Sequence, residues 1–565
     1  MCGIFFCARY DKEDCALLSD RLKHANGARG PDSQTTRRVS VTGSSDAVVI
    51  LDLFASELRL RGRNPVVQPH EHNGNIFCWN GEIFDGMDIG KEDNDGVKLF
   101  RILGALDTVE QVANVFGTIE GPYAFVYYHA ASQRVFFARD PLGRRSLLIH
   151  KPSTRNPYFL LASVSVGLDP SYDFQELSTE YIYCLELRDL PNGGEMASNF
   201  DSYTTSFPRS SANALYSQPG RVNTVLPPED WPIIAGLETP DHLVQAVDDL
   251  IHCLDRSVEL RVRDIPQSPA GTGAARVAVL FSGGIDSTVL AYFAHNHIPL
   301  DEPIDLLNVA FQNPRKIKVQ TVGNITKGQK RPPKQAANPP PPYMVPDRVT
   351  GLQELEELRR LCPRVWNFVE VNVPYEDSQG SHAVVESLMF PGRTVMDLSL
   401  ALALYFASSG KGLVREHPNA DPAPYTSPAR VLLNGLGSDE LLGGYGRHRT
   451  AYETGGWKSV IDELQLEIDR IPSRNLGRDD RVISSHGKET RHPFLSLSVV
   501  SFLAGLPVHL KVDPRAETGL GDKMLLRLAA RKVGLVEASS RKKRAMQFGS
   551  HSARMEGEKR GDVSI

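Results

Sequence analysis

The stretch VAVLFSGGIDSTVLAYF, residues 277–293, constrains the fold of this 565-residue chain more than any other. An apolar run typical of a buried strand is followed by a glycine turn and then by apolar residues at helical spacing. Glycines let the backbone wrap closely, and successive N–H groups at a helix N-terminus form a site for pyrophosphate. The stretch therefore predicts an α/β fold with a phosphate-binding loop. It is not a Walker loop, because no Gly-Lys-Ser/Thr ends it.

The rest of the chain divides around this α/β segment. Residues 1 to about 170 carry short alternating apolar runs separated by turn residues, which predicts a β-rich domain. From about 171 to 240 the pattern loosens into Ser, Thr and Pro, as in a connector. Beyond 240, helical and strand patterns alternate. We predict a first domain with its connector at 1–210 and a second domain at 240–555.

Composition limits the partners. The 63 basic and 68 acidic residues give a net charge of −5, so no basic field indicates nucleic acid or lipid, and small-molecule substrates are expected. The longest apolar segment, LSLALALYFA, is about half as long as a membrane span. Seven dispersed cysteines without a Cys-x-x-Cys pair predict reduced thiols in a cytoplasmic protein. The basic, Pro-rich stretch at about 313–343 is predicted to be a disordered insertion, and composition favours solvated linker over a nucleic-acid contact.

Candidate chemistry in the first domain begins at Cys2, directly behind Met1. Removal of the methionine would give this cysteine a free α-amine, whose pKa of roughly 7.7 to 8 suits a base for a thiol that titrates near 8.5. Polar clusters stand at the edges of later apolar runs, in ARGPDS, WNGEIF and ENDGVKLF. Together these features resemble the glutaminase domain of class II glutamine amidotransferases. That resemblance implies an αββα sandwich of the N-terminal-nucleophile type.

The same resemblance assigns roles. Cys2 would be the nucleophile, with the Asn80 side chain and the Gly81 backbone N–H as the oxyanion hole. Asp95 would hold the substrate ammonium, with Glu82 beside it. The family places an arginine on the substrate carboxylate, in a stretch that usually reads His-x-Arg-Leu. Here the stretch is ASELRLRG, which lacks the histidine and offers either Arg59 or Arg61.

Motifs of the second domain extend the resemblance. SGGIDS resembles the loop of ATP pyrophosphatases, LLNGLGSDELLGGYGRHR resembles an SGEGSDExxGGY segment, and GKETRHPFL resembles an ExRxPFLD segment. In this order they resemble glutamine-dependent asparagine synthetase, and are closest to a divergent branch of that family. The resemblance implies a Rossmann-like PP-loop domain, with ATP and Mg²⁺ used to adenylate the aspartate side chain. Ammonia from the first domain would then displace AMP to form asparagine.

By position, the resemblance also assigns an ATP site. It consists of Leu280 (backbone), Ser282, Gly283, Gly284, Asp286, Ser287, Ala310 and Gly435. Asp286 and Asp397 are the candidate Mg²⁺ ligands, and Lys523 would stabilise developing charge. Asp439 and Glu440 are alternatively helix-capping residues.

One departure from the family leaves the acceptor chemistry open. Leu436 stands where the family motif has glutamate, so a non-catalytic or regulatory relative, or an enzyme with another acceptor, is the alternative to an asparagine synthetase. A homodimer is a further expectation. His70 and His72 have a spacing that a strand could present to a metal, but they lack a third ligand.

Overall fold

The computed structural model describes residues 2–43, 48–62, 64–190, 195–209, 215–267, 271, 273–312, 342–417, 419–554 and 563. Met1 lies outside the described residues. So does the predicted insertion, apart from its last two positions.

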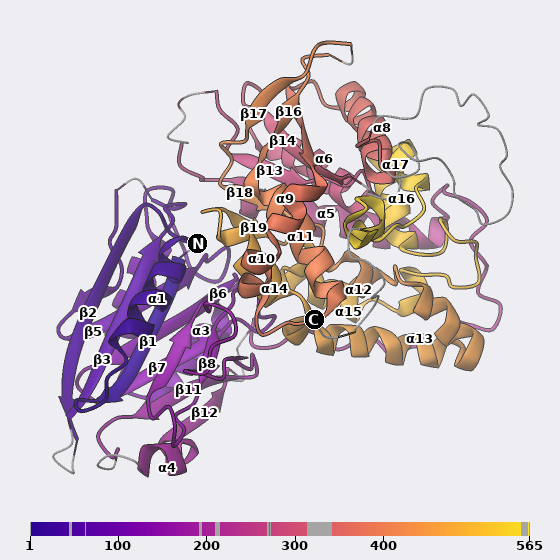
Figure 1. The fold of residues 1–565 in the computed structure, drawn as a ribbon. Helices are drawn as coiled ribbons and strands as arrows, with labels where there is room; N and C mark the ends of the chain where they lie inside the picture. Colours follow the sequence, from indigo (N-terminus) through magenta and orange to yellow (C-terminus); the bar gives the residue numbers. More distant parts are fainter. Residues whose placement is uncertain are drawn as a thin grey trace, which may run out of the picture.

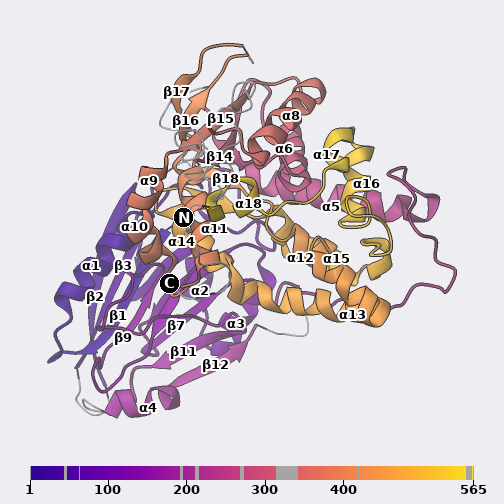
Figure 2. The ribbon, with the colours of Figure 1, turned by 45° about the vertical axis from the view of Figure 1, so that its right-hand side comes forward.

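The first domain stacks two six-stranded sheets, with α1 outside one sheet and α2 and α3 outside the other (Figures 1 and 2). The first sheet has the order β10-β8-β9-β1-β3-β2 and the second the order β12-β11-β7-β6-β5-β4. The strands are β1 Cys2–Tyr10, β2 Ser33–Thr42, β3 Val48–Glu57, β4 His70–His72, β5 Asn75–Gly81, β6 Tyr123–His129, β7 Arg134–Arg139, β8 Leu148–His150, β9 Phe159–Ala162, β10 Gln175–Glu176, β11 Tyr181–Glu186 and β12 Thr204–Pro208. The helices are α1 Ala16–Gly27, α2 Asp95–Leu103, α3 Val109–Thr118 and α4 Glu195–Tyr203.

The alternation of side chains along each strand explains these layers, because successive residues point to opposite faces of the sheet. Along β1, Ile4 and Phe6 enter the core between the two sheets, whereas Phe5 and Cys7 face the core under α1. On the far side, α2 and α3 pack against the second sheet through residues such as Phe116. The first domain is therefore the predicted αββα sandwich, and its central strand β1 starts at Cys2.

The second domain contains a seven-stranded sheet of order β17-β16-β15-β14-β13-β18-β19. Strands β15, β14, β13, β18 and β19 are parallel, and β16 and β17 add antiparallel to one edge. The strands are β13 Val277–Leu280, β14 Ile304–Phe311, β15 Trp366–Val373, β16 Lys411–Val414, β17 Ala423–Thr426, β18 Val431–Leu433 and β19 Glu489–Arg491. The helices are α5 Val244–Val262, α6 Ile285–His297, α8 Pro346–Leu361, α9 Tyr375–Gly380, α10 His382–Met389, α11 Val395–Ser409, α12 Ser438–Leu442, α13 Gly446–Arg474, α14 Leu476–Ser484, α15 Leu497–Gly505, α16 Met524–Lys532, α17 Val536–Ser540 and α18 Met546–Gly549.

Helices cover both faces of this sheet. Helices α5, α6, α8 and α16 share one hydrophobic core with it, and α10, α11 and α14 share another. Strands β13, β14, β15 and β18 contribute to both cores, as expected of a doubly wound α/β domain. Helix α6 begins at Ile285, inside the SGGIDS motif, so the glycine turn leads directly into the helix N-terminus.

The structure corrects one expectation at the domain boundary. Residues 171–208, predicted from their loose pattern to begin a connector, contain β11 and β12, which complete the second sheet of the first domain. Strand β12, TTSFP, lies at the sheet edge and is largely solvent-exposed. Such a strand lacks the apolar alternation on which the prediction relied.

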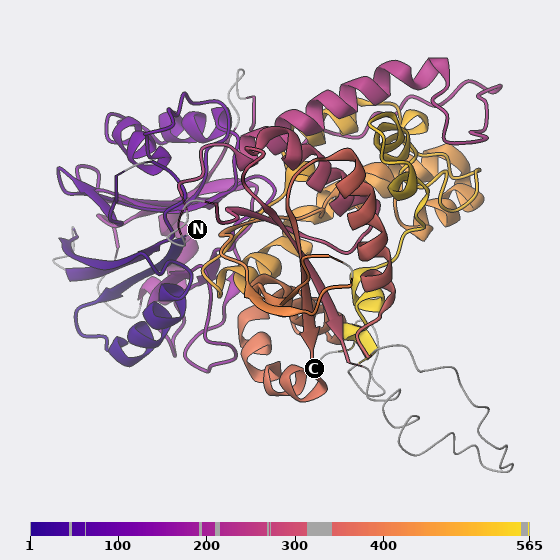
Figure 3. The ribbon, with the colours of Figure 1, turned by 90° about the horizontal axis from the view of Figure 1, so that it is seen from above.

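The two domains share a buried interface, and the chain's N-terminus lies at this junction (Figures 1 and 3). Leu58, Leu60 and Leu142 of the first domain belong to the hydrophobic core of the second. Buried ion pairs join the domains as well, such as that between Arg29 and Asp480 at 2.6 Å. All seven cysteines are free thiols. In the described part of the chain, no helix has the length and apolarity that crossing a membrane requires.

Candidate active sites

The first candidate site is built around Cys2, at the start of β1. The Cys2 backbone N–H donates to Asn80 Oδ1 at 3.0 Å, so Asn80 at the end of β5 lies beside the cysteine. Asn80 is fully buried, and its Nδ2 has no hydrogen-bond partner among the described residues. Buried amide donors are nearly always paired, because an unpaired one costs free energy. A free donor next to a candidate nucleophile matches what a developing oxyanion requires.

Gln68 also contacts the nucleophile, although the sequence did not single it out as a site residue. Its Nε2 donates to Cys2 Sγ at 3.4 Å, and its Oε1 accepts from the Trp79 backbone N–H at 2.8 Å. The second bond fixes the orientation of the amide that points at the sulfur. Burial raises the pKa of the Cys2 thiol to about 11, so the thiol needs a base to react at neutral pH.

Asp95 lies in the first turn of α2, which Asn94 caps by accepting from the Val97 N–H. Its two carboxylate oxygens accept from the backbone N–H groups of Ile83 and Gly96, each at 2.9 Å. Burial, and then the neighbouring Glu82, raise the pKa of Asp95 to about 7. A cationic group arriving beside Asp95 would favour its ionised form, as an ammonium-binding residue requires.

The structure separates the two candidate arginines. The Arg61 side chain is 6% exposed, donates to Glu82 at 2.6 Å and to the Ile83 carbonyl at 3.2 Å, and lies over the Phe84 ring. The Arg59 side chain is 34% exposed and forms a 3.3 Å ion pair with Glu57. The Arg61 guanidinium is thus occupied by contacts with Glu82 and the Ile83 carbonyl, whereas the Arg59 guanidinium is partly exposed to solvent.

The second candidate site is the loop between β13 and α6. Gly283 has φ +74°, and a Cβ there would lie 2.3 Å from the Gly351 backbone nitrogen, so this position requires glycine. Gly435 lies close against the loop, because a Cβ there would be 2.9 Å from the Asp286 Cβ. The Ser287 hydroxyl donates back to the Gly284 carbonyl at 3.1 Å. The two predicted glycine-rich segments therefore meet at this loop.

Lys523 connects the loop to the second glycine-rich segment. Its Nζ lies 2.7 Å from both Asp286 and Asp439 and 2.9 Å from the Ser438 hydroxyl. Burial alone would lower the pKa of Lys523, but the carboxylates of Asp286 and Asp439 raise it above its usual value, so the lysine stays charged. Lys543 also pairs with Asp439 at 2.5 Å. Asp439, for which helix capping was an alternative, is therefore part of a charge cluster in which Lys523 is buried and the other members are partly exposed.

Other predicted site residues have different neighbours. Leu280 ends β13, and Ala310 is fully buried on the adjacent strand β14. Asp397 contacts Arg478 at 2.5 Å and the Thr394 hydroxyl at 2.6 Å, whereas Asp286 contacts Lys523. No group of three or more His, Cys, Asp or Glu within the described ranges is placed to hold a metal ion. His70 instead packs against both Phe77 and Phe100, which also contact each other.

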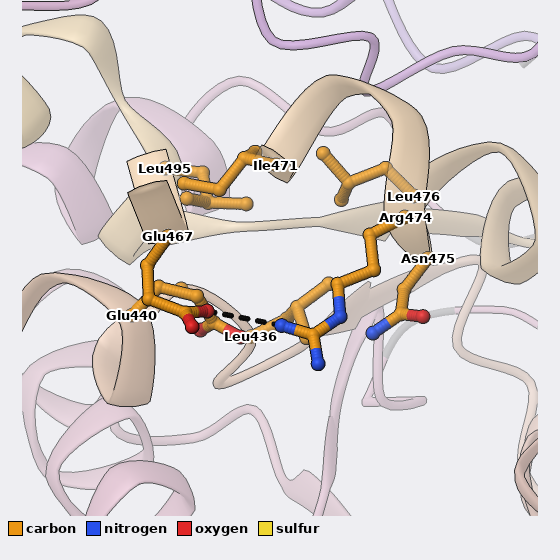
Figure 4. A pocket seen from close by; sticks show the side chains of 9 residues that line it. Leu436, Glu440, Glu467, Ile471, Arg474, Asn475, Leu476 and Leu495 are labelled. Atoms are coloured by element: carbon orange, nitrogen blue, oxygen red, sulfur yellow. Dashed lines mark hydrogen bonds and ion pairs between the residues drawn. The ribbon is translucent and has the colours of Figure 1, made fainter. Parts of the chain in front are cut away.

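Leu436 lies at a small cavity between α12, α13 and α14 (Figure 4). The cavity measures about 20 Å³, enough for about one water molecule. Its lining combines apolar residues, Leu436, Ile471, Leu476 and Leu495, with polar ones, Glu440, Glu467 and Arg474, and Glu467 and Arg474 are joined at 2.9 Å. At the position of the family glutamate, the chain thus has an apolar side chain next to two other carboxylates.

Comparisons with known proteins agree with this arrangement. A glutamine amidotransferase domain model matches residues 1–182, and an asparagine synthase model matches residues 451–563. Asparagine synthetase domain-containing protein 1 from Gallus gallus is 35% identical, over 98% of this chain and 98% of its own length. The Homo sapiens protein of that name is 35% identical, over 98% and 95%. The glutamine-hydrolyzing asparagine synthetase of Gallus gallus is 22% identical, over 93% and 80%.

Among solved structures, a Bacillus subtilis glutamine phosphoribosylpyrophosphate amidotransferase complexed with ADP and GMP aligns at 13% identity. The alignment covers 54% of this chain and 65% of that one, with a TM-score of 0.27, too low to carry an argument.

Fold, sites and family models define a two-domain protein of the asparagine synthetase-like glutamine amidotransferase class. The chain belongs to the family of asparagine synthetase domain-containing protein 1.

Proposed function

We propose that this protein is a glutamine-dependent asparagine synthetase: it hydrolyses glutamine at Cys2, adenylates the side-chain carboxylate of aspartate with ATP, and converts the adenylate to asparagine. The observation that carries the proposal is the unpartnered, buried Asn80 Nδ2 beside Cys2. A buried free donor is costly unless a ligand uses it, and the carbonyl oxygen of a glutamine amide attacked by Cys2 is such a ligand.

In the first half-reaction, Cys2 Sγ attacks the amide carbon, and the thiol proton passes to a base and then to the leaving nitrogen. The base we propose is the α-amine that Cys2 acquires once Met1 is removed. Asn80 Nδ2 and the Gly81 N–H stabilise the oxyanion, ammonia leaves, and water hydrolyses the thioester to glutamate. Arg59 binds the glutamine carboxylate and Asp95 its ammonium.

In the second half-reaction, a carboxylate oxygen of aspartate attacks the α-phosphorus of ATP and pyrophosphate leaves. Ammonia then displaces AMP. The loop of Ser282, Gly283 and Gly284 binds phosphate through backbone N–H groups at the start of α6. Lys523, buried and charged, stabilises negative charge on the phosphate oxygens.

The residues at this loop can hold Mg²⁺ only if phosphate oxygens of the bound nucleotide supply most of its ligands. Mg²⁺ commonly uses one or two carboxylates together with substrate phosphates. Asp286 lies in the loop motif itself and can supply one carboxylate, although Lys523 also contacts it, whereas the contacts of Asp397 are with Arg478 and Thr394. When bound, the ion would neutralise charge on the triphosphate. Asp286 is the ligand we favour.

The direct test supplies purified protein with ATP, Mg²⁺, aspartate and glutamine labelled with ¹⁵N at the amide. Release of pyrophosphate and labelled asparagine in equal amounts is the expected result. Glutamate release without pyrophosphate would instead support a different acceptor, which the apolar Leu436 favours as the second candidate. Neither glutamate nor pyrophosphate would overturn the proposal and support a non-catalytic relative.

Arg59 and Arg61 give the first prediction. Arg59→Met will raise the KM for glutamine at least about tenfold, because it removes a charge-assisted contact to a carboxylate. Arg61→Met will instead lower the melting temperature, since it leaves Glu82 buried with less compensation. Steady-state glutaminase assays and thermal melts distinguish the two. A larger KM change in a folded Arg61→Met protein would reverse the assignment.

Asp95 gives a prediction on pH. Its pKa of about 7 means that it is protonated at lower pH and cannot pair with an ammonium. The Kd for glutamine, measured by calorimetry with the Cys2→Ser protein, should therefore rise below pH 7, by up to about tenfold per pH unit. Asp95→Asn should bind weakly at every pH. Burial also raises the pKa of Glu57 to about 7, so Glu57→Gln is the control: loss of the pH dependence there would contradict the role of Asp95.

A further inference from the structure

The loop that carries Arg59 and Arg61 is held on two sides by the other domain. This glutamine loop, residues 57–62, begins at Glu57, the last residue of β3, which pairs in register with Cys2. Leu58 and Leu60 pack into the hydrophobic core of the second domain. Arg59 and Arg61 alternate with these leucines, and they contact the first-domain carboxylates of Asp32 and Glu82, Arg59 through its backbone N–H and Arg61 through its guanidinium. The position of the glutamine loop therefore depends on the residues that hold those two carboxylates in place.

The carboxylates of Asp32 and Glu82 both form ion pairs with arginines of the second domain. Arg430 donates to the two Asp32 oxygens at 2.7 and 3.1 Å, and Asp32 accepts the Arg59 backbone N–H at 2.8 Å. Arg491 contacts Glu82 at 3.2 Å, and Glu82 holds the Arg61 guanidinium at 2.6 Å. Each arginine of the glutamine loop is thus one carboxylate away from an arginine of the second domain. We call Arg430 and Arg491 the arginine clamp.

The arginine clamp is built on the strand pair that also supports the ATP loop. Arg430 directly precedes β18, and its carbonyl accepts the Glu489 N–H at 2.7 Å. Arg491 ends β19, and its carbonyl accepts the Asn434 N–H at 2.9 Å. Asn434 is followed by Gly435, which lies directly against Asp286 of the SGGIDS motif. A shift of this strand pair would move the clamp and the ATP loop together.

The geometry points to a coupling role: we propose that Arg430 and Arg491 are positioning residues that make glutamine binding at Arg59 depend on nucleotide bound at the SGGIDS loop. This inference rests on the proposed function, since it takes glutamine and ATP as the two ligands. The expected sign is positive, because nucleotide that orders β18 and β19 would fix the carboxylates that hold the glutamine loop. Linkage requires glutamine to strengthen nucleotide binding by the same factor.

Arg430 allows a well-matched experiment. Its side chain is 26% exposed, and its partner Asp32 is 18% exposed. Arg276 and Glu302, a pair within the second domain, have exposures of 25% and 10% and are joined by two guanidinium contacts. Arg430→Met and Arg276→Met therefore remove arginines of equal exposure, only one of which touches the glutamine loop. Arg430→Lys, which keeps the charge, tests for rescue.

The measurement is the Kd for glutamine by calorimetry, with the full chain in a Cys2→Ser background, without and with saturating α,β-methylene-ATP. We expect the nucleotide analogue to tighten glutamine binding at least about fivefold, the lower end of typical coupling between sites. Arg430→Met should weaken glutamine binding and remove the effect of the nucleotide analogue. Arg430→Lys should restore part of it, and Arg276→Met should change neither. Arg491→Lys, which keeps the positive charge at the buried member of the clamp, should reduce the coupling.

The outcomes separate this inference from the proposed function. Equal Kd values and equal nucleotide effects for Arg430→Met and Arg276→Met would overturn the clamp. Failure of the Cys2→Ser protein to bind glutamine would overturn both proposals. Normal coupling in a wild-type protein that releases neither glutamate nor pyrophosphate would support the clamp and reject the enzyme. Thermal melts check that the Arg430→Met and Arg276→Met proteins are equally stable. A difference in glutamine binding between two equally stable proteins cannot then come from a general loss of stability.

Discussion

Cys2→Ala will reduce glutamine hydrolysis at least about 10⁴-fold, since removal of a nucleophile leaves only the background that binding and an oxyanion hole supply. The protein should still form asparagine when ammonium replaces glutamine, because the SGGIDS loop and Lys523 are untouched. The readouts are glutamate release and ammonium-dependent pyrophosphate release. Together they test whether Cys2 serves only the first half-reaction.

Cys7→Ala is the matched control for this change. Cys7 lies on the same strand, β1, and is also buried, but its sulfur faces Cys15 at 3.6 Å rather than Asn80. Glutamine hydrolysis by Cys7→Ala should remain within a few-fold of wild type. Equal losses in the two variants would mean that β1 was disturbed rather than that a nucleophile was removed, and residual hydrolysis by Cys2→Ala near the wild-type rate would reject Cys2 as the nucleophile.

Short motifs are the part of these sites that sequence predicts well. The strand, glycine turn and helix of the SGGIDS segment are all present, because each follows from a local pattern of apolar residues and glycines. Asn80 was predicted from its own motif, and the structure places it beside Cys2. The αββα sandwich and the α/β domain are likewise as expected.

Contacts between distant polar residues are the part that sequence could not supply. Arg430 and Asp32 are 398 positions apart, and neither stands in a periodic pattern. Their pairing depends on how the domains dock, which no local propensity encodes. For the same reason, the sequence could not show whether Arg59 or Arg61 is available to bind the glutamine carboxylate. The two arginines are two residues apart, and what separates them is the ion pair of Arg61 with the buried Glu82. The polar edge strand β12 was missed because its stability comes from pairing with β11.

Lys523→Met will reduce ATP-dependent pyrophosphate release by about 10² to 10³-fold, the range seen when a fixed charge-stabilising donor is removed from an active site. Glutamine hydrolysis should persist, because the hydrogen bonds and ion pairs of Lys523 within the described ranges, to Asp286, Asp439 and Ser438, are all with second-domain groups. The change also leaves Asp286 and Asp439 close together without their shared cation, which lowers stability. Lys523→Arg, which retains the charge, separates a loss of folding from a loss of chemistry.

Lys511→Met is the control for burial of a lysine. Both side chains belong to residues that are 1% exposed, but Lys511 donates to a backbone carbonyl, that of Leu503, and burial lowers its pKa to about 7. Removing this poorly compensated amine should leave pyrophosphate release unchanged and should not lower the melting temperature at pH 8 by more than Lys523→Met does. A folded Lys523→Met protein with wild-type pyrophosphate release would show that the charge cluster supports α12 and α16 rather than the reaction at the phosphate.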